Sequence, residues 1–235
     1  DDQDKTVVVN TDRQITMSTS PVAYFNTQGN GAMVVQVLGG AYGTKYSVFI
    51  DGVIRSYYVT PSGAGAGDGQ YITTEHIASR LLEGLLLTGC VVSPGDGGEA
   101  YRTGYCATWT TERLADVFYV KKPSGTFTFT VSDGAAGANM KACTDSVTAI
   151  EDLPRMAPHY FAVRIAENTD REKDLWFKFI ESANENNTTP GAGFGSGYWK
   201  EAVAPNTDTL FSAGTMPHKL VYNDPGFTLS QDVYD

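Results

Sequence analysis

A glycine-rich stretch in the first third of the chain has the placement of a phosphate-binding loop. It lies between a predicted strand that ends at Thr60 and a predicted helix that begins near Thr73, and its glycines are Gly63, Gly65, Gly67 and Gly69. Main-chain N–H groups at such a strand-to-helix turn can bind phosphate. The spacing is not G-x-G-x-x-G, however, because Asp68 takes the place of the last glycine, and no lysine follows as in a P-loop. Since a carboxylate repels phosphate, we interpret the stretch as a connecting loop.

A serine among glycines and three histidines are the residues whose types suggest nucleophilic or acid–base chemistry. Ser196 stands in Gly193–Gly197, but a nucleophile elbow requires glycine two residues before the serine, where this chain has Phe194. The histidines are far apart, with no second histidine four residues away, and they are His76, His159 and His218. We expect His76 on a helix surface, His159 in a proline-rich turn, and His218 to fix its loop by bonding a backbone carbonyl.

The cysteines and tryptophans point to no defined site either. The cysteines, Cys90, Cys106 and Cys143, include no C-x-x-C pair and no Cys/His cluster, so neither a zinc site nor a disulfide framework is indicated. A single bridge between Cys90 and Cys106 remains an alternative. The tryptophans are Trp109, Trp176 and Trp199, and with the many carboxylates they leave open a glycan-binding or glycan-cleaving site with paired acids. No catalytic, cofactor-binding or metal-ligating residue is assigned.

Apolar and polar residues alternate over many short stretches, which predicts a mainly β fold with one or two helices (α+β) and antiparallel sheets. Strands are expected at residues 6–10, 14–17, 33–38, 46–50, 53–60, 117–120, 127–131, 160–165, 175–180 and 198–203. The stretches 33–38, 46–50 and 53–60 form an antiparallel meander in this interpretation. Asp51-Gly52 supplies its hairpin turn.

One stretch, at about residues 73–88, has the period of a helix. Ile77, Leu81 and Leu85 recur at intervals of four residues, Thr73 or Thr74 can cap the first turn, and Gly89 is a stop signal. Gly84 lowers the intrinsic stability of this helix by about 1 kcal/mol relative to alanine. We therefore expect close packing of the helix on a sheet at Gly84.

The predicted elements group into three parts. Residues 1–30 are expected to end a preceding β-rich platform, residues 31–150 to form an antiparallel sheet plus the helix, and residues 151–235 to form a second β-rich domain that leads into a further C-terminal region. The sheet-plus-helix unit is thus inserted in, or followed by, the second domain. Residues 184–197 are poor in apolar side chains and rich in Asn, Thr and Gly, which predicts a flexible loop.

The chain is strongly acidic, with a formal net charge of −10 and a pI of about 4.7. A surface that holds DNA is basic, because neutralising phosphates supplies most of the non-specific affinity. Such a charge suits a passage along which DNA slides without adhering, but many ordinary proteins are equally acidic. No apolar run is long enough to cross a bilayer, and the most apolar segment is Leu81–Leu87.

Five short motifs in a fixed order carry a family resemblance. They are Val7-Val8-Val9-Asn10, Gly39-Gly40-Ala41-Tyr42-Gly43 with the strand that follows, Thr60-Pro61-Ser62-Gly63, Leu153-Pro154 with Ala157-Pro158, and Thr215-Met216-Pro217-His218 before a short strand. Together they resemble the tail nozzle proteins of short-tailed bacteriophages, also called tail tubular protein B. Thr215, Met216, Pro217 and His218 form the signature loop.

This resemblance implies a structural virion protein rather than an enzyme, without a cofactor. Such proteins form a homohexameric ring in the distal part of the tail, contact the tail adaptor and tail fibres, and let genomic DNA pass without sequence-specific binding. Assembly in the host cytoplasm is implied as well. Strand edges and long loops are the expected contact elements. In the loops, the candidate contact residues are Lys121, Lys122, Asn186, Asn187 and Phe194.

Overall fold

The computed structural model describes residues 24–26, 31–92, 98–166, 175–202, 220–223 and 226–229. These residues form a mainly β structure with one α-helix and several antiparallel sheets, which confirms the predicted fold class. Residues 23–205 make one compact unit, and residues 1–22 with 206–235 make another. The described part of the latter is a hairpin of β16 (Leu220–Asn223) and β17 (Gly226–Leu229). The predicted strands at 6–10 and 14–17 and the Thr215–His218 loop lie outside the described residues.

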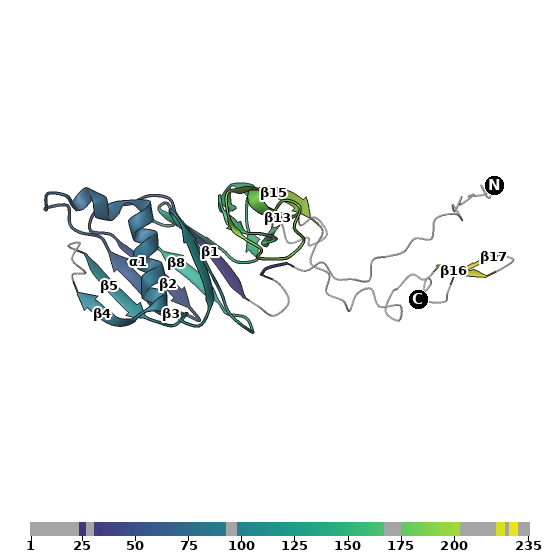
Figure 1. The fold of residues 1–235 in the computed structure, drawn as a ribbon, viewed down its shortest axis with the longest axis horizontal. Coiled ribbons are helices and arrows are strands. Elements are labelled where there is room, and N and C mark those ends of the chain that lie inside the picture. The colour runs from purple at the N-terminus through teal and green to yellow at the C-terminus, as the bar shows by residue number, and fades with distance from the viewer. Residues whose placement is uncertain are drawn as a thin grey trace. The chain divides into compact units, whose positions relative to one another are not determined.

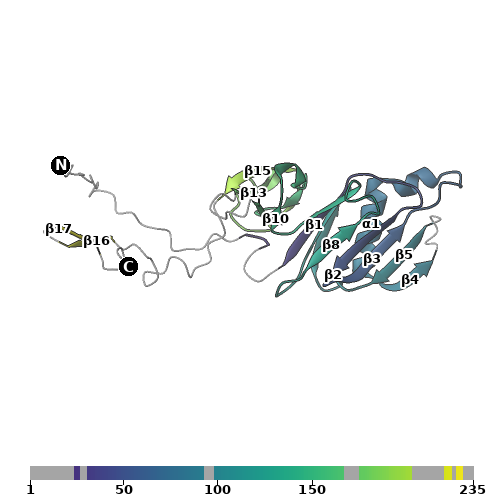
Figure 2. The same ribbon diagram turned by 180° about the vertical axis from the view of Figure 1, so that it is seen from behind.

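The larger unit contains a five-stranded antiparallel sheet in the order β4-β5-β3-β2-β8. Its strands are β2 (Lys45–Ile50), β3 (Val53–Val59), β4 (Thr88–Val92), β5 (Glu99–Thr103) and β8 (Phe129–Ser132). Figure 1 shows the helix α1 lying across this sheet, and Figure 2 shows the strands from the opposite face. The hairpin prediction is confirmed, because Asp51 and Gly52 join β2 to β3 with φ values of 53° and 73°.

A four-stranded sheet has the order β6-β7-β1-β9, with β1 (Ala32–Val37), β6 (Thr110–Leu114), β7 (Val117–Lys121) and β9 (Met140–Cys143). The predicted meander is therefore wrong for its first strand, because β1 pairs with β7 and β9 instead of β2. Met33, Val34 and Val35 are all fully buried, so β1 is covered on both faces. A continuous apolar run of this kind does not reveal its pairing partners.

The helix α1 (Thr74–Leu86) follows a short 3-10 helix, η1 (Asp68–Ile72), and occupies most of the predicted range. Thr73 caps it by accepting a hydrogen bond from the His76 N–H at 3.3 Å. Ile77, Leu81 and Leu85 are fully buried against the sheets. The helix ends two residues earlier than predicted, because the chain turns into β4 at Thr88 and leaves Gly89 inside that strand.

A second four-stranded sheet has the order β10-β12-β13-β15. Its strands are β10 (Ser146–Val147), β12 (Ala162–Ile165), β13 (Leu175–Glu181) and β15 (Gly197–Ala202), and the short strands β11 (Ala157–Pro158) and β14 (Phe194–Gly195) pair beside it. β12, β13 and β15 pair in antiparallel fashion as predicted, whereas β10 pairs with β12 in parallel. Two 3-10 helices, η2 (Ile150–Asp152) and η4 (Ser182–Asn184), lie in the connections.

The sheet that contains β1 is the middle layer between two apolar clusters. Met33 and Val35 belong to the cluster that includes α1 and the five-stranded sheet. Val34 belongs to a second cluster with Phe179 of β13 and with Phe161, which directly precedes β12. Among the described residues, no helix has the length and apolar character that a membrane crossing requires.

Candidate functional site

The residues that suggested catalysis have other tasks in the structure. Within the described ranges, no group of three or more His, Cys, Asp and Glu side chains could hold a metal ion. In the glycine-rich loop, the carboxylate of Asp68 accepts the N–H of Gly65 at 2.9 Å, so the loop binds its own acid where a phosphate would bind. Cys106 and Cys143 are buried free thiols, so the alternative Cys90–Cys106 bridge is absent, and burial raises the pKa of Cys106 to about 12.

The histidines are packing and hydrogen-bonding residues. His76 is half-buried on α1 and packs against the rings of Tyr58 and Tyr71 at centroid distances of 5.5 and 5.3 Å, so its place on the helix surface is partly covered by these two rings. His159 is fully buried. Its Nδ1 accepts the backbone N–H of Glu181 at 3.2 Å, and its Nε2 lies 2.8 Å from the Asn187 carbonyl oxygen. Because a backbone N–H can only donate, Nδ1 carries no proton and Nε2–H is the donor.

The tryptophans that suggested a glycan site are held by neighbouring residues. Trp199 donates its indole N–H to the Pro154 carbonyl at 2.8 Å and packs edge-on against Phe179. Trp109 packs against Tyr105 and Phe127. Both side chains are partly buried and support the apolar clusters.

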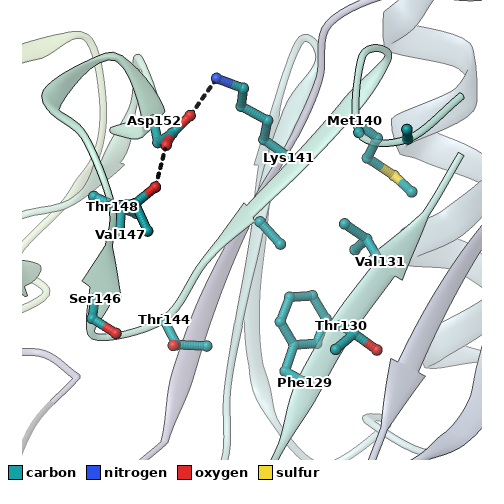
Figure 3. Close-up of a pocket in the computed structure, with 13 residues that line it drawn as sticks. Phe129, Thr130, Val131, Met140, Lys141, Thr144, Ser146, Val147, Thr148 and Asp152 are labelled. Atoms are coloured by element: carbon teal, nitrogen blue, oxygen red, sulfur yellow. Dashed lines mark hydrogen bonds and ion pairs between the residues drawn. The ribbon is translucent and has the colours of Figure 1, made fainter. Parts of the chain in front are cut away.

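The described surface contains an open groove of about 620 Å³. It lies beside β8 and β9, which follow each other in sequence yet form the edges of two different sheets and do not pair with each other. Figure 3 shows Val131 and Met140 on one side of the groove and Lys141, Thr148 and Asp152 on the other. Both sides mix polar and apolar residues, since Thr130 lies beside Val131 and Val147 lies beside Thr148, and the Lys141–Asp152 ion pair lies on the second side.

A single buried carboxylate shapes the loop that joins β8 to β9. Asp133 is 2% exposed. Its Oδ1 accepts the N–H groups of Ala135 and Gly137 at 2.8 and 3.1 Å, and its Oδ2 accepts those of Asn139 and Met140 at 2.6 and 3.0 Å. Burial alone raises the pKa of Asp133, but the four N–H donors outweigh it and hold the pKa below its usual range.

An ion pair organises the second side of the groove. The Lys141 ammonium lies 2.6 Å from Asp152 Oδ1, and Thr148 donates its hydroxyl to Asp152 Oδ2 at 3.1 Å. The hydrogen bond from Lys141 is the largest cause that lowers the pKa of Asp152. Both carboxylate oxygens of Asp152 thus accept a hydrogen bond, one from Lys141 of β9 and one from Thr148.

The predicted contact residues lie in different places. Lys121 ends β7, and its ammonium lies 4.1 Å from the centre of the Phe25 ring, where burial lowers its pKa. Lys122 begins the exposed loop before β8 and lies 3.3 Å from the Thr126 carbonyl oxygen. Within the described residues, we observe no contact between either lysine and the segment at residues 184–197.

The segment at residues 184–197 makes defined contacts in the structure. Asn187 accepts the His159 ring hydrogen, Asn186 is exposed, and Phe194 lies in β14 with its ring 5.1 Å from that of Tyr119. The predicted flexible loop thus contains a short strand, β14, and accepts a hydrogen bond from a buried histidine. Sequence inspection also missed Asp133, although an aspartate followed by glycines and other small residues is a known signal for side-chain capping of a loop.

Comparisons with known proteins agree with the motif resemblance. A family model described as bacteriophage nozzle protein matches residues 3–235. The tail tubular protein gp12 of Escherichia phage T7 is 24% identical over 220 residues, which cover 93% of this chain and 24% of that protein. The chain thus spans about a quarter of the length of the curated relative that it matches.

Proposed function

The chain belongs to the bacteriophage nozzle protein family, and from this premise we propose that it forms part of the wall of the passage through which the genome leaves the particle. As a member of this family it is a structural component of the phage tail. The observation that carries the proposal is the family match over nearly the whole chain, from residue 3 to residue 235.

Copies of the chain assemble into a closed ring, a hexamer by resemblance, in the distal part of the tail. The tail adaptor and the tail fibres are its neighbours there. In a cyclic ring of identical subunits, two different patches of the chain meet at every interface. The signature loop Thr215–His218 and the contact residues Lys122 and Asn186 remain candidates for such patches.

The passage is passive, and this segment performs no reaction. Its net charge of −10 supports that role, because an acidic wall does not retain phosphates. The layered sheets and two apolar clusters supply a packed core for such a wall. We retain the division into a sheet-plus-helix part at residues 31–150 and a second β-rich part at residues 151–235 as a proposal on domain organisation.

Assembly in solution tests the proposal. The segment of residues 1–235 and the whole protein that contains it are each measured by mass photometry, alone and with the tail adaptor. We expect the isolated segment to be monomeric or weakly associated, and the whole protein to form rings when the adaptor is present. A stable compact dimer under both conditions would contradict the ring.

A further inference from the structure

Within the described residues, neither edge strand of the five-stranded sheet contains the charged residues or prolines that often protect a sheet edge. A free edge exposes N–H and C=O groups that pair with other chains, and proteins blunt it with charged residues, proline or a very short strand. In the three larger sheets of the described chain, the edge strands β6, β9 and β15 carry charged residues, and β10 has only two residues. β4 (Thr88–Val92) and β8 (Phe129–Ser132) are longer and carry no charge.

Among the described residues, no strand pairs with the outer side of β8, and the strand lines the groove there. The Asp51 N–H donates to the Thr128 carbonyl at 2.9 Å, and β2 pairs with β8 in antiparallel register from there onward. Because bonding direction alternates along an antiparallel strand, the main-chain groups of Phe129 and Val131 point away from β2.

The β4 edge lies at the opposite end of the same sheet and runs in the same direction as β8. Four successive antiparallel pairings, β4 with β5, β5 with β3, β3 with β2 and β2 with β8, separate the two edges. An even number of reversals restores the direction, so β4 and β8 are parallel. A copy that keeps the same orientation therefore presents β4 in parallel to the β8 of its neighbour.

We propose that β8 of one copy pairs with β4 of the next copy, so that the five-stranded sheets join around the ring. The two different edges form a heterologous contact, which is the type that closes a cyclic ring. This inference rests on the ring in the proposed function and adds the surfaces that close it.

The charge of the chain supports a second copy of it as the partner that pairs with β8. Each copy carries a net charge of −10, so copies repel one another wherever acidic surfaces meet. The edge strands β4 and β8 carry no charged residue, so a contact between them brings no like charges together. Main-chain hydrogen bonds then provide the attraction, as in other cases of strand addition.

Disulfide trapping in the whole, adaptor-assembled protein tests the contact. Thr88 and Thr130 are both exposed, so the pair T88C/T130C places one new thiol on each edge. The pair T88C/S132C tests a pairing that is shifted by two residues along β8. After mild oxidation we expect a ladder of covalent multimers that ends at the ring size. The single variants control for the native cysteines, and T88C/T110C, with its second thiol on β6, is the matched pair that should give no ladder.

A charge variant tests the same contact without new bonds. T130K/S132K adds lysines at exposed positions of β8, whereas T110K adds one at an exposed position of β6, an edge that already carries charge. We expect T130K/S132K to weaken ring formation by about tenfold or more, equal to about 1.4 kcal/mol. T110K should leave it unchanged, and both variants should keep the circular dichroism spectrum and the melting temperature of the wild type.

The outcomes separate this inference from the proposed function. Rings that assemble normally with T130K/S132K, or that give no ladder from either cysteine pair, overturn the β8–β4 contact and leave the ring standing. Intact rings that lose only adaptor or fibre binding show that a different chain occupies the edge, which also overturns it. A wild-type protein that forms no ring contradicts the proposed function itself.

Discussion

The region around α1 and the region around residues 182–196 are stabilised in different ways. In the first, Leu81 and its apolar neighbours fill a cluster between two sheets. In the second, the buried ring of His159 bonds Glu181 and Asn187, and the His159 main chain also bonds Gly191 and Gly193. One of these regions therefore depends on buried apolar area, and the other depends on a few satisfied polar groups.

The largest expected effect comes from the apolar region. Leu81→Ala removes a fully buried side chain from the middle of the cluster. We expect it to lower the free energy of unfolding by about 3–5 kcal/mol, as in other leucine-to-alanine changes that leave a cavity. Urea denaturation measures the change. The control is Leu114→Ala, whose side chain is 46% exposed and whose loss should cost less than about 0.5 kcal/mol.

A polar deletion should affect the other region locally. His159→Ala leaves the Glu181 N–H and the Asn187 carbonyl without partners, and we expect a loss of about 3 kcal/mol. Hydrogen exchange should rise across residues 182–193 and remain low in α1. Asn186→Ala, at an exposed position in the same segment, is the control. Equal increases in exchange in both regions would show that the two are not separate in their stabilisation.

The Asp133 carboxylate brings polar stabilisation into the apolar region, and its effect depends on pH. Asp133→Asn replaces an acceptor of four N–H groups with a side chain that has one acceptor oxygen, at a cost of about 2 kcal/mol near neutral pH. Because the folded pKa lies below the unfolded value of about 3.9, this contribution is complete above that pH and declines as pH falls through the folded pKa.

Urea denaturation of the wild type and Asp133→Asn at a series of acidic pH values checks this dependence. The difference between the two proteins should shrink as the carboxylate becomes protonated. Asp145→Asn changes an exposed aspartate and should show no comparable trend. A difference that stays constant down to the acid-unfolding range would mean that the loop does not depend on the charge of Asp133.

The smallest expected effect tests how closely the helix packs. A Cβ at Gly84 would lie 2.6 Å from the Tyr101 carbonyl oxygen and 2.2 Å from Ser56 Oγ. Helix propensity favours Gly84→Ala by about 1 kcal/mol, whereas overpacking costs about 1–3 kcal/mol, so we expect a net loss of up to about 2 kcal/mol. Thermal unfolding measures it. A gain in stability would show that the helix can move off the sheet freely.

The sequence predicted those features whose signals are local. The period of Ile77, Leu81 and Leu85 located α1, Asp51-Gly52 located a hairpin, and the packing expected at Gly84 is present. The pairing of β1 could not be predicted, because an apolar strand buried on both faces carries no mark of its neighbours. The strands β5 and β9 were not predicted at all, because they are short and carry mixed polar and apolar residues.

The candidate groove was not predictable, because it depends on contacts between distant residues. Lys141 meets Asp152 only once β9 and the η2 turn lie side by side. Outside the groove, the contacts of His159 with Glu181 and Asn187 likewise join residues that are 22 and 28 positions apart in sequence. The family motifs nevertheless indicated the function, because their order along the chain can be recognised without knowledge of the fold. They did not locate the groove or the uncharged edge strands.

Labelled electron microscopy of the intact particle tests the central claim most directly. An epitope tag in the exposed loop between Lys122 and Thr126 can be marked with an antibody fragment on purified virions. The account predicts label arranged around the axis at the distal end of the tail. Label on the capsid or along the fibres, or turnover of a substrate by the purified chain, would contradict a passive structural role in the nozzle.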